Sequence, residues 1–235
     1  MQNNPHTSKQ YDAELDQVRS QVLRMGNLVE RQVVYAIEAL RRTDAALSER
    51  VIESENEING LEVSIDELCT TLIARRQPNS NDLRVIMMAL KTITDLERIG
   101  DEAKKIALAT REMYGQVRGQ LPRFSSVALV ADIVLGMLRR AMNAFEKLDS
   151  SDVAAIARQD REVDEYFQSI LRQLLTYMIE DPRTISASID IIFIAKSLER
   201  IGDHAKNISE YVIYMVKGKD VRHVTVEEIE RVAES

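Results

Sequence analysis

Apolar residues recur along this chain at intervals of three and four positions, the spacing of a helix with one buried face. The first such stripe, Leu15–Leu40, predicts a helix over Tyr11–Arg42. A second stripe begins after Asp44, a residue type that caps helix N-termini, and a third predicts a helix over about Asp82–Met113. No segment shows the alternating pattern of a strand, so the sequence predicts helices only.

The second half of the chain repeats this pattern. A shift of 105 positions pairs Val33 with Leu138 and Ile58 with Val163, and the string LERIGD occurs twice, 102 positions apart. The offset changes at two polar, proline-containing segments, "RRQPNSND" and "IEDPRTIS", which is where loops absorb deletions. The repeat therefore predicts three further helices, over about Ser126–Leu148, Asp149–Ile179 and Ile185–Val216.

The predicted fold is all-α, a tandem repeat of two three-helix bundles with six long helices. The first repeat is predicted over residues 11–113 and the second over residues 126–216. Glycine and proline mark the segment Tyr114–Ser126 as the link between them. Residues 217–235 are predicted to form a short C-terminal tail with one or two more helical turns.

Composition narrows the class of partner. The formal net charge is −7 and the pI is about 5.2, so the chain has no general attraction for nucleic acid, and cations are its natural small partners. The single Cys69 lies in an apolar helical stripe and is predicted to be a small buried hydrophobe. No apolar run approaches the ~18 residues of a membrane span, and the N-terminus lacks the apolar core of a signal peptide.

Acidic residues form a duplicated pattern. Each LERIGD copy holds two carboxylates four positions apart, on one side of a helix at the edge of its apolar arc. Like charges so placed repel, and the preceding helix of each repeat offers a matching polar pair. Oxygen-rich clusters suit hard or borderline cations such as Mg, Mn, Ca or iron. Two metal clusters are predicted: Glu55, Asn59, Glu97 and Asp101, and Asp160, Asp164, Glu199 and Asp203.

The same residues have a simpler interpretation. The acids could be solvated or paired with basic side chains nearby, namely Arg98, Arg200, Lys104 or Lys206. Gly100 and Gly202 lie beside the acids, although glycine inside a helix costs ~1 kcal/mol relative to alanine. They could make room either for a ligand or for a closely packed helix.

Histidine is scarce, which excludes several chemistries. Only His6, His204 and His223 occur, and neither repeat contains the Glu-x-x-His of a ferritin-like di-iron site. His204 follows Asp203 directly and points away from it, so we expect a surface histidine rather than a ligand. No HExxH, CxxC pair, P-loop or dinucleotide-binding glycine motif occurs, and no catalytic set can be identified.

Both copies of LERIGD, together with "ARRQPNSNDLR" and "YMVKGKDVRHV", resemble the PhoU family of phosphate-specific transport system accessory proteins. The resemblance implies two similar three-helix bundles and negative regulation of phosphate-starvation signalling and phosphate uptake. It implies a cytoplasmic adaptor, peripheral to membrane complexes, between the ATPase of the phosphate ABC transporter and a phosphate-sensing histidine kinase. Homodimerisation is a further family-level expectation.

The family also carries acidic E(D)xxxD motifs that bind metal ions or metal clusters, with Mg, Mn, Zn or Fe as possible ions. Three of the four pairs here match that motif, whereas Asn59 stands where the second acid of its pair is expected. The resemblance therefore implies a first cluster that binds metal more weakly than the second. A metal-dependent enzyme built on the acids, and a purely structural bundle, are the competing hypotheses.

Overall fold

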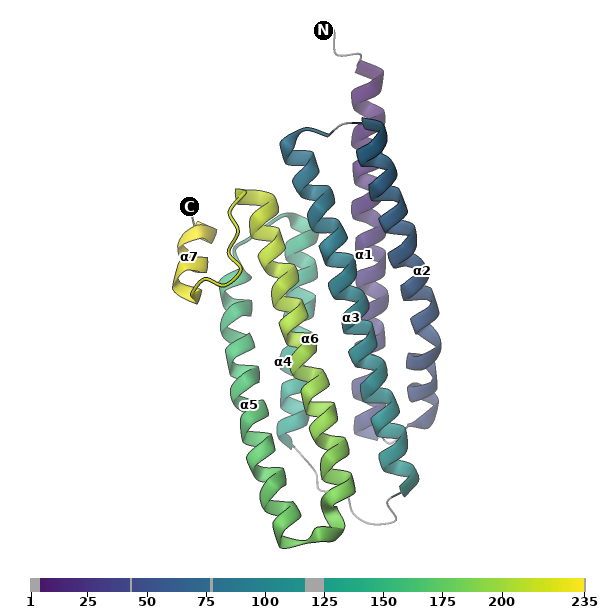
Figure 1. Ribbon diagram of the computed structural model, residues 1–235, viewed down its shortest axis with the longest axis vertical. Helices are drawn as coiled ribbons and strands as arrows, with labels where there is room; N and C mark the ends of the chain where they lie inside the picture. The colour runs from purple at the N-terminus through teal and green to yellow at the C-terminus, as the bar shows by residue number, and fades with distance from the viewer. Residues whose placement is uncertain (1–4, 43, 77, 117–124, 235) are drawn as a thin grey trace.

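The computed structural model describes residues 5–42, 44–76, 78–116 and 125–234, and within these ranges the regular structure is helical (Figure 1). Helices α1, α2 and α3 form one bundle, and α4, α5 and α6 form a second bundle beside it. The predicted tandem of three-helix bundles is therefore confirmed. In chain order the elements are α1 (Pro5–Arg42), α2 (Ala45–Arg76), α3 (Ser80–Gln116), α4 (Ser125–Lys147), α5 (Val153–Glu180), the 3₁₀ helix η1 (Pro182–Thr184), α6 (Ile185–Lys217) and α7 (Val226–Glu234).

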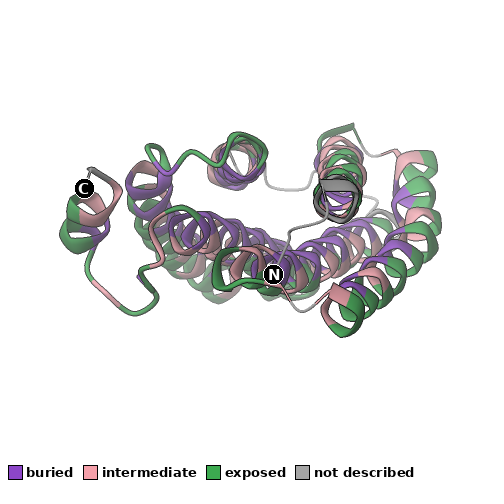
Figure 2. Cartoon of the chain, turned by 90° about the horizontal axis from the view of Figure 1, so that it is seen from above, coloured by how far each residue is buried: buried purple, intermediate pink, exposed green. Residues whose placement is uncertain are grey.

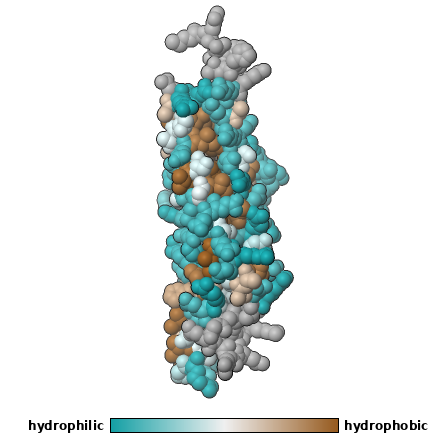
Figure 3. Space-filling view, turned by 90° about the vertical axis from the view of Figure 1, so that its right-hand side faces the viewer, coloured by the Kyte–Doolittle hydropathy of each residue, from teal (hydrophilic) through white to brown (hydrophobic). Residues whose placement is uncertain are grey.

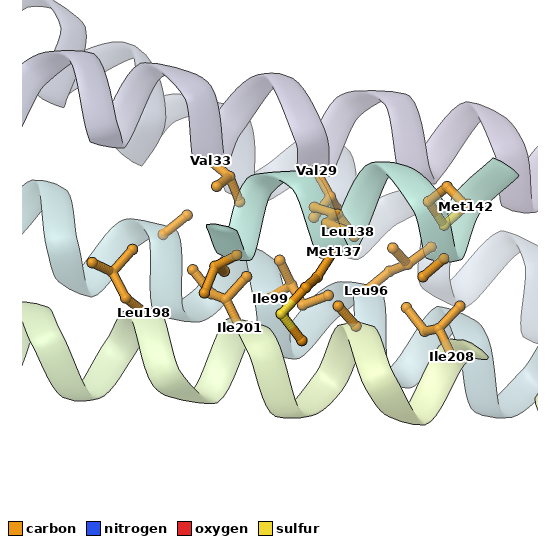
Figure 4. Close-up of a cluster of buried hydrophobic side chains, with 14 of the residues drawn as sticks. Val29, Val33, Leu96, Ile99, Met137, Leu138, Met142, Leu198, Ile201 and Ile208 are labelled. Carbon is orange, nitrogen blue, oxygen red and sulfur yellow. The ribbon is translucent and has the colours of Figure 1, made fainter. Parts of the chain in front are cut away.

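The two bundles share one hydrophobic core. Helix α3 packs most extensively against α6, its counterpart in the other repeat, and α1 packs against α4. Figure 4 shows Leu96 and Ile99 from α3 beside Met137 from α4 and Ile201 from α6. Seen from above in Figure 2, buried residues line the inner sides of the helices and exposed residues the outer sides. The repeats are thus packed as one body, as the matching apolar stripes of α3 and α6 require.

Polar caps determine where several helices begin. The side chain of Asp44 accepts hydrogen bonds from the backbone N–H groups of Ala46 and Leu47, at 2.9 and 3.2 Å, as its predicted capping role requires. Asn79 accepts from the N–H groups of Asn81 and Asp82, so α3 begins at Ser80, slightly earlier than the apolar pattern indicated.

Helix α5 begins four residues later than predicted. Leu148 adopts a left-handed backbone conformation with φ 51°, which ends α4. The side chain of Asp149 then accepts from the N–H of Ser151 and forms a turn before α5 begins at Val153. The sequence pattern could not separate this turn from the helix, because aspartate is equally suited to cap either one.

The C-terminal tail forms helix α7, which packs mainly against α5 through a small apolar cluster of its own, including Val226 and Ile229. Most of the predicted link Tyr114–Ser126 lies outside the described residues, while α3 extends into it as far as Gln116. In the described part of the chain, no helix combines the length and apolar character needed to cross a membrane. Polar side chains cover most of the face that α2 presents in Figure 3, with apolar groups in small patches between them.

Candidate functional site

A lysine on the third helix of each repeat pairs with an acid on the second helix. Lys104 of α3 contacts the carboxylate of Glu55 on α2, and Lys206 of α6 donates to Asp160 on α5 at 2.8 Å. Both lysines follow the LERIGD aspartate by three positions, so the two repeats build the same cross-helix ion pair. For these two acids, pairing with a nearby basic side chain is what the structure shows.

The second acidic cluster holds more negative charge than its lysines neutralise. Burial, together with the charges of Asp160, Glu199 and Asp164, raises the pKa of Asp203 to about 6. The pKa of Asp164 is raised for the same kind of reason, although its side chain lies at the exposed rim. Glu199 is paired with Lys196 at 2.6 Å through one oxygen, while its other oxygen is buried without a hydrogen-bond partner. The structure thus brings the four predicted acids of this cluster into mutual electrostatic contact.

The first cluster has a different membership from the predicted one. Burial raises the pKa of Glu97, and the carboxylates of Asp101, Glu62 and Glu55 raise it further. Asn59 is exposed and lies on the same side of α2, four positions after Glu55 and three before Glu62. The structure therefore places Glu62 beside Glu55, Glu97 and Asp101, as a member that the prediction did not include.

Glu62 is a site residue that the sequence pattern missed. It lies seven positions after Glu55, two helical turns along the same side of α2, and both burial and Asp101 raise its pKa. The corresponding position of the second repeat is Phe167, over whose ring Lys196 lies at 5.3 Å. A search for duplicated acids could not find Glu62, whereas the i, i+7 spacing within α2 could have. With Glu62 present, the number of carboxylates no longer distinguishes the two clusters.

The donor chemistry of both clusters fits a hard cation, because carboxylate oxygens are the ligands that such ions prefer. The second cluster has more acids than bases, and their repulsion helps to raise the pKa of Asp203. A bound cation would neutralise this excess negative charge. As the side chains stand, no three His, Cys, Asp or Glu residues within the described ranges form a ready coordination sphere. A metal would be held here by carboxylates that now face lysine, namely Glu55 and Asp160, together with the two LERIGD pairs.

The LERIGD glycines make room for packed helices rather than for a ligand. A Cβ on Gly100 would lie 2.9 Å from the Oε1 atom of Gln32 on α1 and 3.5 Å from Ile58 on α2. A Cβ on Gly202 would make ordinary contacts at 3.6 Å with Met137 and Val134 of α4. The neighbours of both glycines are core side chains of adjacent helices, so close packing explains these positions.

The prediction of a surface position for His204 is wrong. His204 is buried, and its Nδ1 lies 2.6 Å from Oδ1 of Asp95 on α3. Arg200 of α6 reaches the buried Glu102 of α3 at 3.1 Å in the same interface. The prediction failed because it treated each bundle alone, whereas the far side of α6 packs against the other repeat.

Comparison with known proteins identifies both repeats. The PhoU domain family model matches residues 22–110 and 127–212. The chain is 43% identical over 228 residues to the phosphate-specific transport system accessory protein PhoU of Escherichia coli, covering 97% of this chain and 94% of that one. It is 47% identical over 220 residues to the PhoU homolog of Pseudomonas putida, covering 93% of this chain and 85% of the relative.

Solved structures agree with this match. The crystal structure of PhoU from Pseudomonas aeruginosa superposes with a TM-score of 0.86 at 44% identity, covering 89% of this chain and all of that one. The phosphate transport system regulatory protein PhoU from Streptococcus pneumoniae superposes with a TM-score of 0.82 at 27% identity, covering 90% and 99% of the two chains. On the sequence match and the shared fold, this chain belongs to the PhoU family.

Proposed function

We propose that this protein is a non-catalytic negative regulator of phosphate uptake and phosphate-starvation signalling. The observation that carries the proposal is the match over both repeats to relatives named as phosphate-specific transport system accessory proteins. In the proposed role it is a cytoplasmic adaptor between the ATPase of a phosphate ABC transporter and a phosphate-sensing histidine kinase. It acts as a homodimer at the periphery of these membrane complexes. The two bundles packed side by side offer separate faces to two partners, which supports an adaptor role (Figure 1).

The proposal includes metal binding by the acidic clusters. Excess carboxylate charge around Asp203, and around Glu97 in the first repeat, supports a cation at each position. Burial favours the second cluster as the tighter site, because Asp160 is buried there and Asp203 carries the larger pKa shift. The bound ion would supply positive charge that holds the second and third helices of a repeat together. Its identity among Mg, Mn, Zn and Fe is left open by the carboxylate donor set.

Co-purification tests the adaptor role. Tagged protein is expected to retain both the transporter ATPase and the sensor kinase from cells grown with ample phosphate, and each partner is then tested singly with purified components. Repeating the binding with and without added metal shows whether the ion regulates the contact. Failure to retain either purified partner under both conditions would contradict the adaptor proposal.

Elemental analysis of protein purified without chelators tests the metal sites. Replacing the four acids of the second cluster with alanine is expected to lower the metal content per chain. The matched control changes four exposed acids of the same repeat to alanine, so that both proteins lose four negative charges. Equal metal content in the cluster variant and the control would refute metal binding at the second cluster. The control residues are Glu146, Glu162, Glu165 and Glu180.

A further inference from the structure

Two sequence segments remote from the acidic clusters meet at one cleft. The segment "ARRQPNSNDLR" ends in the first turns of α3, and "YMVKGKDVRHV" begins in the last turn of α6 and continues beyond it. Because α3 and α6 run antiparallel, Arg84 from the first segment and Arg222 from the second line the same cleft, whose volume is about 620 Å³. This volume lies within the range of small-molecule sites, ~300–1,000 Å³. The start of α3 and the end of α6, which contribute residues to its lining, lie at the upper end of the α3–α6 interface in Figure 1.

Three basic side chains give the cleft its charge. Arg84 donates to Asn81 through one nitrogen, while its Nε is buried without a hydrogen-bond partner. Lys91 lies 5.6 Å from the ring centre of Tyr211, and no ion pair with any carboxylate of the described chain holds it. Arg222 is paired with Asp220 through both nitrogens and holds the pKa of that carboxyl at about 2. Arg84 thus donates to a neutral amide, and the charge of Lys91 lowers the pKa of Asp220 without an ion pair between them in the described chain, so both cations can still take an oxyanion.

A buried carboxyl group lies in the same cleft. Glu210 is only 6% exposed, yet it makes no hydrogen bond or ion pair with any residue that the structure describes. Burial raises its pKa to about 7; Lys206 and Arg222 lower it, and Asp160 and Asp220 raise it. Burial favours the neutral form of this carboxyl group, and the O–H of that form can donate to an oxyanion in the cleft.

We propose that this cleft binds a phosphoryl oxyanion, either free orthophosphate or a phosphate monoester, between the two cations and Glu210. Phosphoryl oxygens accept charge-assisted hydrogen bonds from Arg84 and Lys91. One hydrogen is shared between a phosphoryl oxygen and the Glu210 carboxyl group, which satisfies the buried group. At neutral pH that hydrogen comes either from the phosphoryl group, whose second proton leaves close to neutral pH (about 6 for a monoester), or from Glu210 itself, whose pKa is about 7. Sulfate brings no proton at neutral pH, so it is held only where Glu210 is itself protonated and is repelled by the ionised carboxylate.

The backbone around the cleft fixes the position of Arg84. Gly218 ends α6 in a left-handed conformation with φ 70°, and a side chain there would overlap the guanidinium of Arg84. The N-terminal turn of α3 opens onto the cleft at Ser80, so the positive end of its dipole adds to the attraction for an anion. The rim also exposes Met87 beside Tyr214, an apolar wall for the organic part of a monoester.

Calorimetric titration of the full-length protein near neutral pH tests the proposal with orthophosphate, phenyl phosphate and sulfate. Both phosphates are expected to bind, and sulfate to bind more weakly, because only the protonated form of Glu210 can donate to it. Arg84→Gln and Lys91→Gln are each expected to weaken phosphate binding about tenfold, the loss of one charge-assisted hydrogen bond. Lys219→Gln, an equal charge change on an exposed residue outside the cleft, is the matched control and should leave affinity unchanged.

Glu210→Gln tests the shared hydrogen separately from the charge. Its amide can donate to an oxyanion that brings no proton, so the preference for phosphate over sulfate is expected to disappear. Tighter binding of phenyl phosphate than of orthophosphate would identify a monoester as the ligand, and the reverse would identify free phosphate. The proposal is overturned if neither phosphate binds, if sulfate binds the wild type as well as phosphate does, or if the cleft variants match the Lys219 control. These titrations contain no partner protein, so their outcome does not test the adaptor role.

Discussion

Alanine substitution of the two LERIGD glycines is expected to change stability in opposite directions. In a helix interior, glycine to alanine gains ~1 kcal/mol where the new methyl group fits. At Gly202 the added Cβ would meet Met137 and Val134 at 3.6 Å, an ordinary contact distance. Gly202→Ala should therefore raise the free energy of unfolding by about 0.5–1 kcal/mol.

Gly100 has less room because of Gln32. The added Cβ would lie 2.9 Å from Oε1 of Gln32, a side chain 1% exposed whose Nε2 donates to the Val51 carbonyl at 3.0 Å. Moving Gln32 would break that buried hydrogen bond at a cost of about 1–3 kcal/mol, which exceeds the helical gain. Gly100→Ala should therefore lower the free energy of unfolding by about 1 kcal/mol.

Urea unfolding followed by circular dichroism measures both effects, with the slope of the transition compared to confirm that only stability has changed. Gln32→Ala supplies the control background, since Gly100→Ala should become neutral or stabilising once the obstructing amide is gone. Stabilisation by both alanines in the wild-type background, or an unchanged effect of Gly100→Ala without Gln32, would refute the packing argument.

Two further predictions concern the polar groups of α6. His204→Ala should lower the free energy of unfolding by about 2–4 kcal/mol, because it leaves the buried Asp95 carboxylate without its 2.6 Å partner. Adding Asp95→Asn to the same chain should restore part of the loss. Strict additivity of the two substitutions in that double-mutant cycle would contradict the pairing. The pKa of Asp203 is raised from 3.8 to about 6, so the native state binds more protons than the unfolded state in this window, and this residue's contribution to stability falls as pH rises through it. In metal-free protein, Asp203→Asn should therefore stabilise the fold more at neutral pH than at a pH below 3.8, the pKa of this carboxyl in the unfolded chain. An equal effect on the free energy of unfolding at both pH values, measured by urea titration, would count against the raised pKa.

The sequence predicted the helices because apolar periodicity and capping residues are local signals. The apolar stripes of α1 to α6 and the cap at Asp44 can be recognised in the sequence without knowing which helices pack together. The sequence prediction places the start of α5 too early, because neither composition nor apolar spacing indicates that Leu148 adopts a left-handed backbone conformation. The link between the repeats lies mostly outside the described residues, so the structure does not test its predicted bounds.

The candidate site was only partly predictable. Duplication singled out the LERIGD acids, yet it concealed Glu62, since the second repeat has Phe167 at the corresponding position. The burial of His204 depends on packing between the repeats, which helical periodicity within one bundle does not specify. Arg84 and Arg222 line the same cleft because α3 packs antiparallel against α6, which the sequence pattern also does not specify.

We propose above that this protein represses the response to phosphate starvation. The most direct measurement is the expression of a phosphate-starvation reporter in cells that lack the gene, grown with ample phosphate. Reporter expression is expected to rise on deletion and to return to the repressed level when the wild-type protein is supplied. Reporter expression that stays low after deletion, with ample phosphate present, would contradict the account.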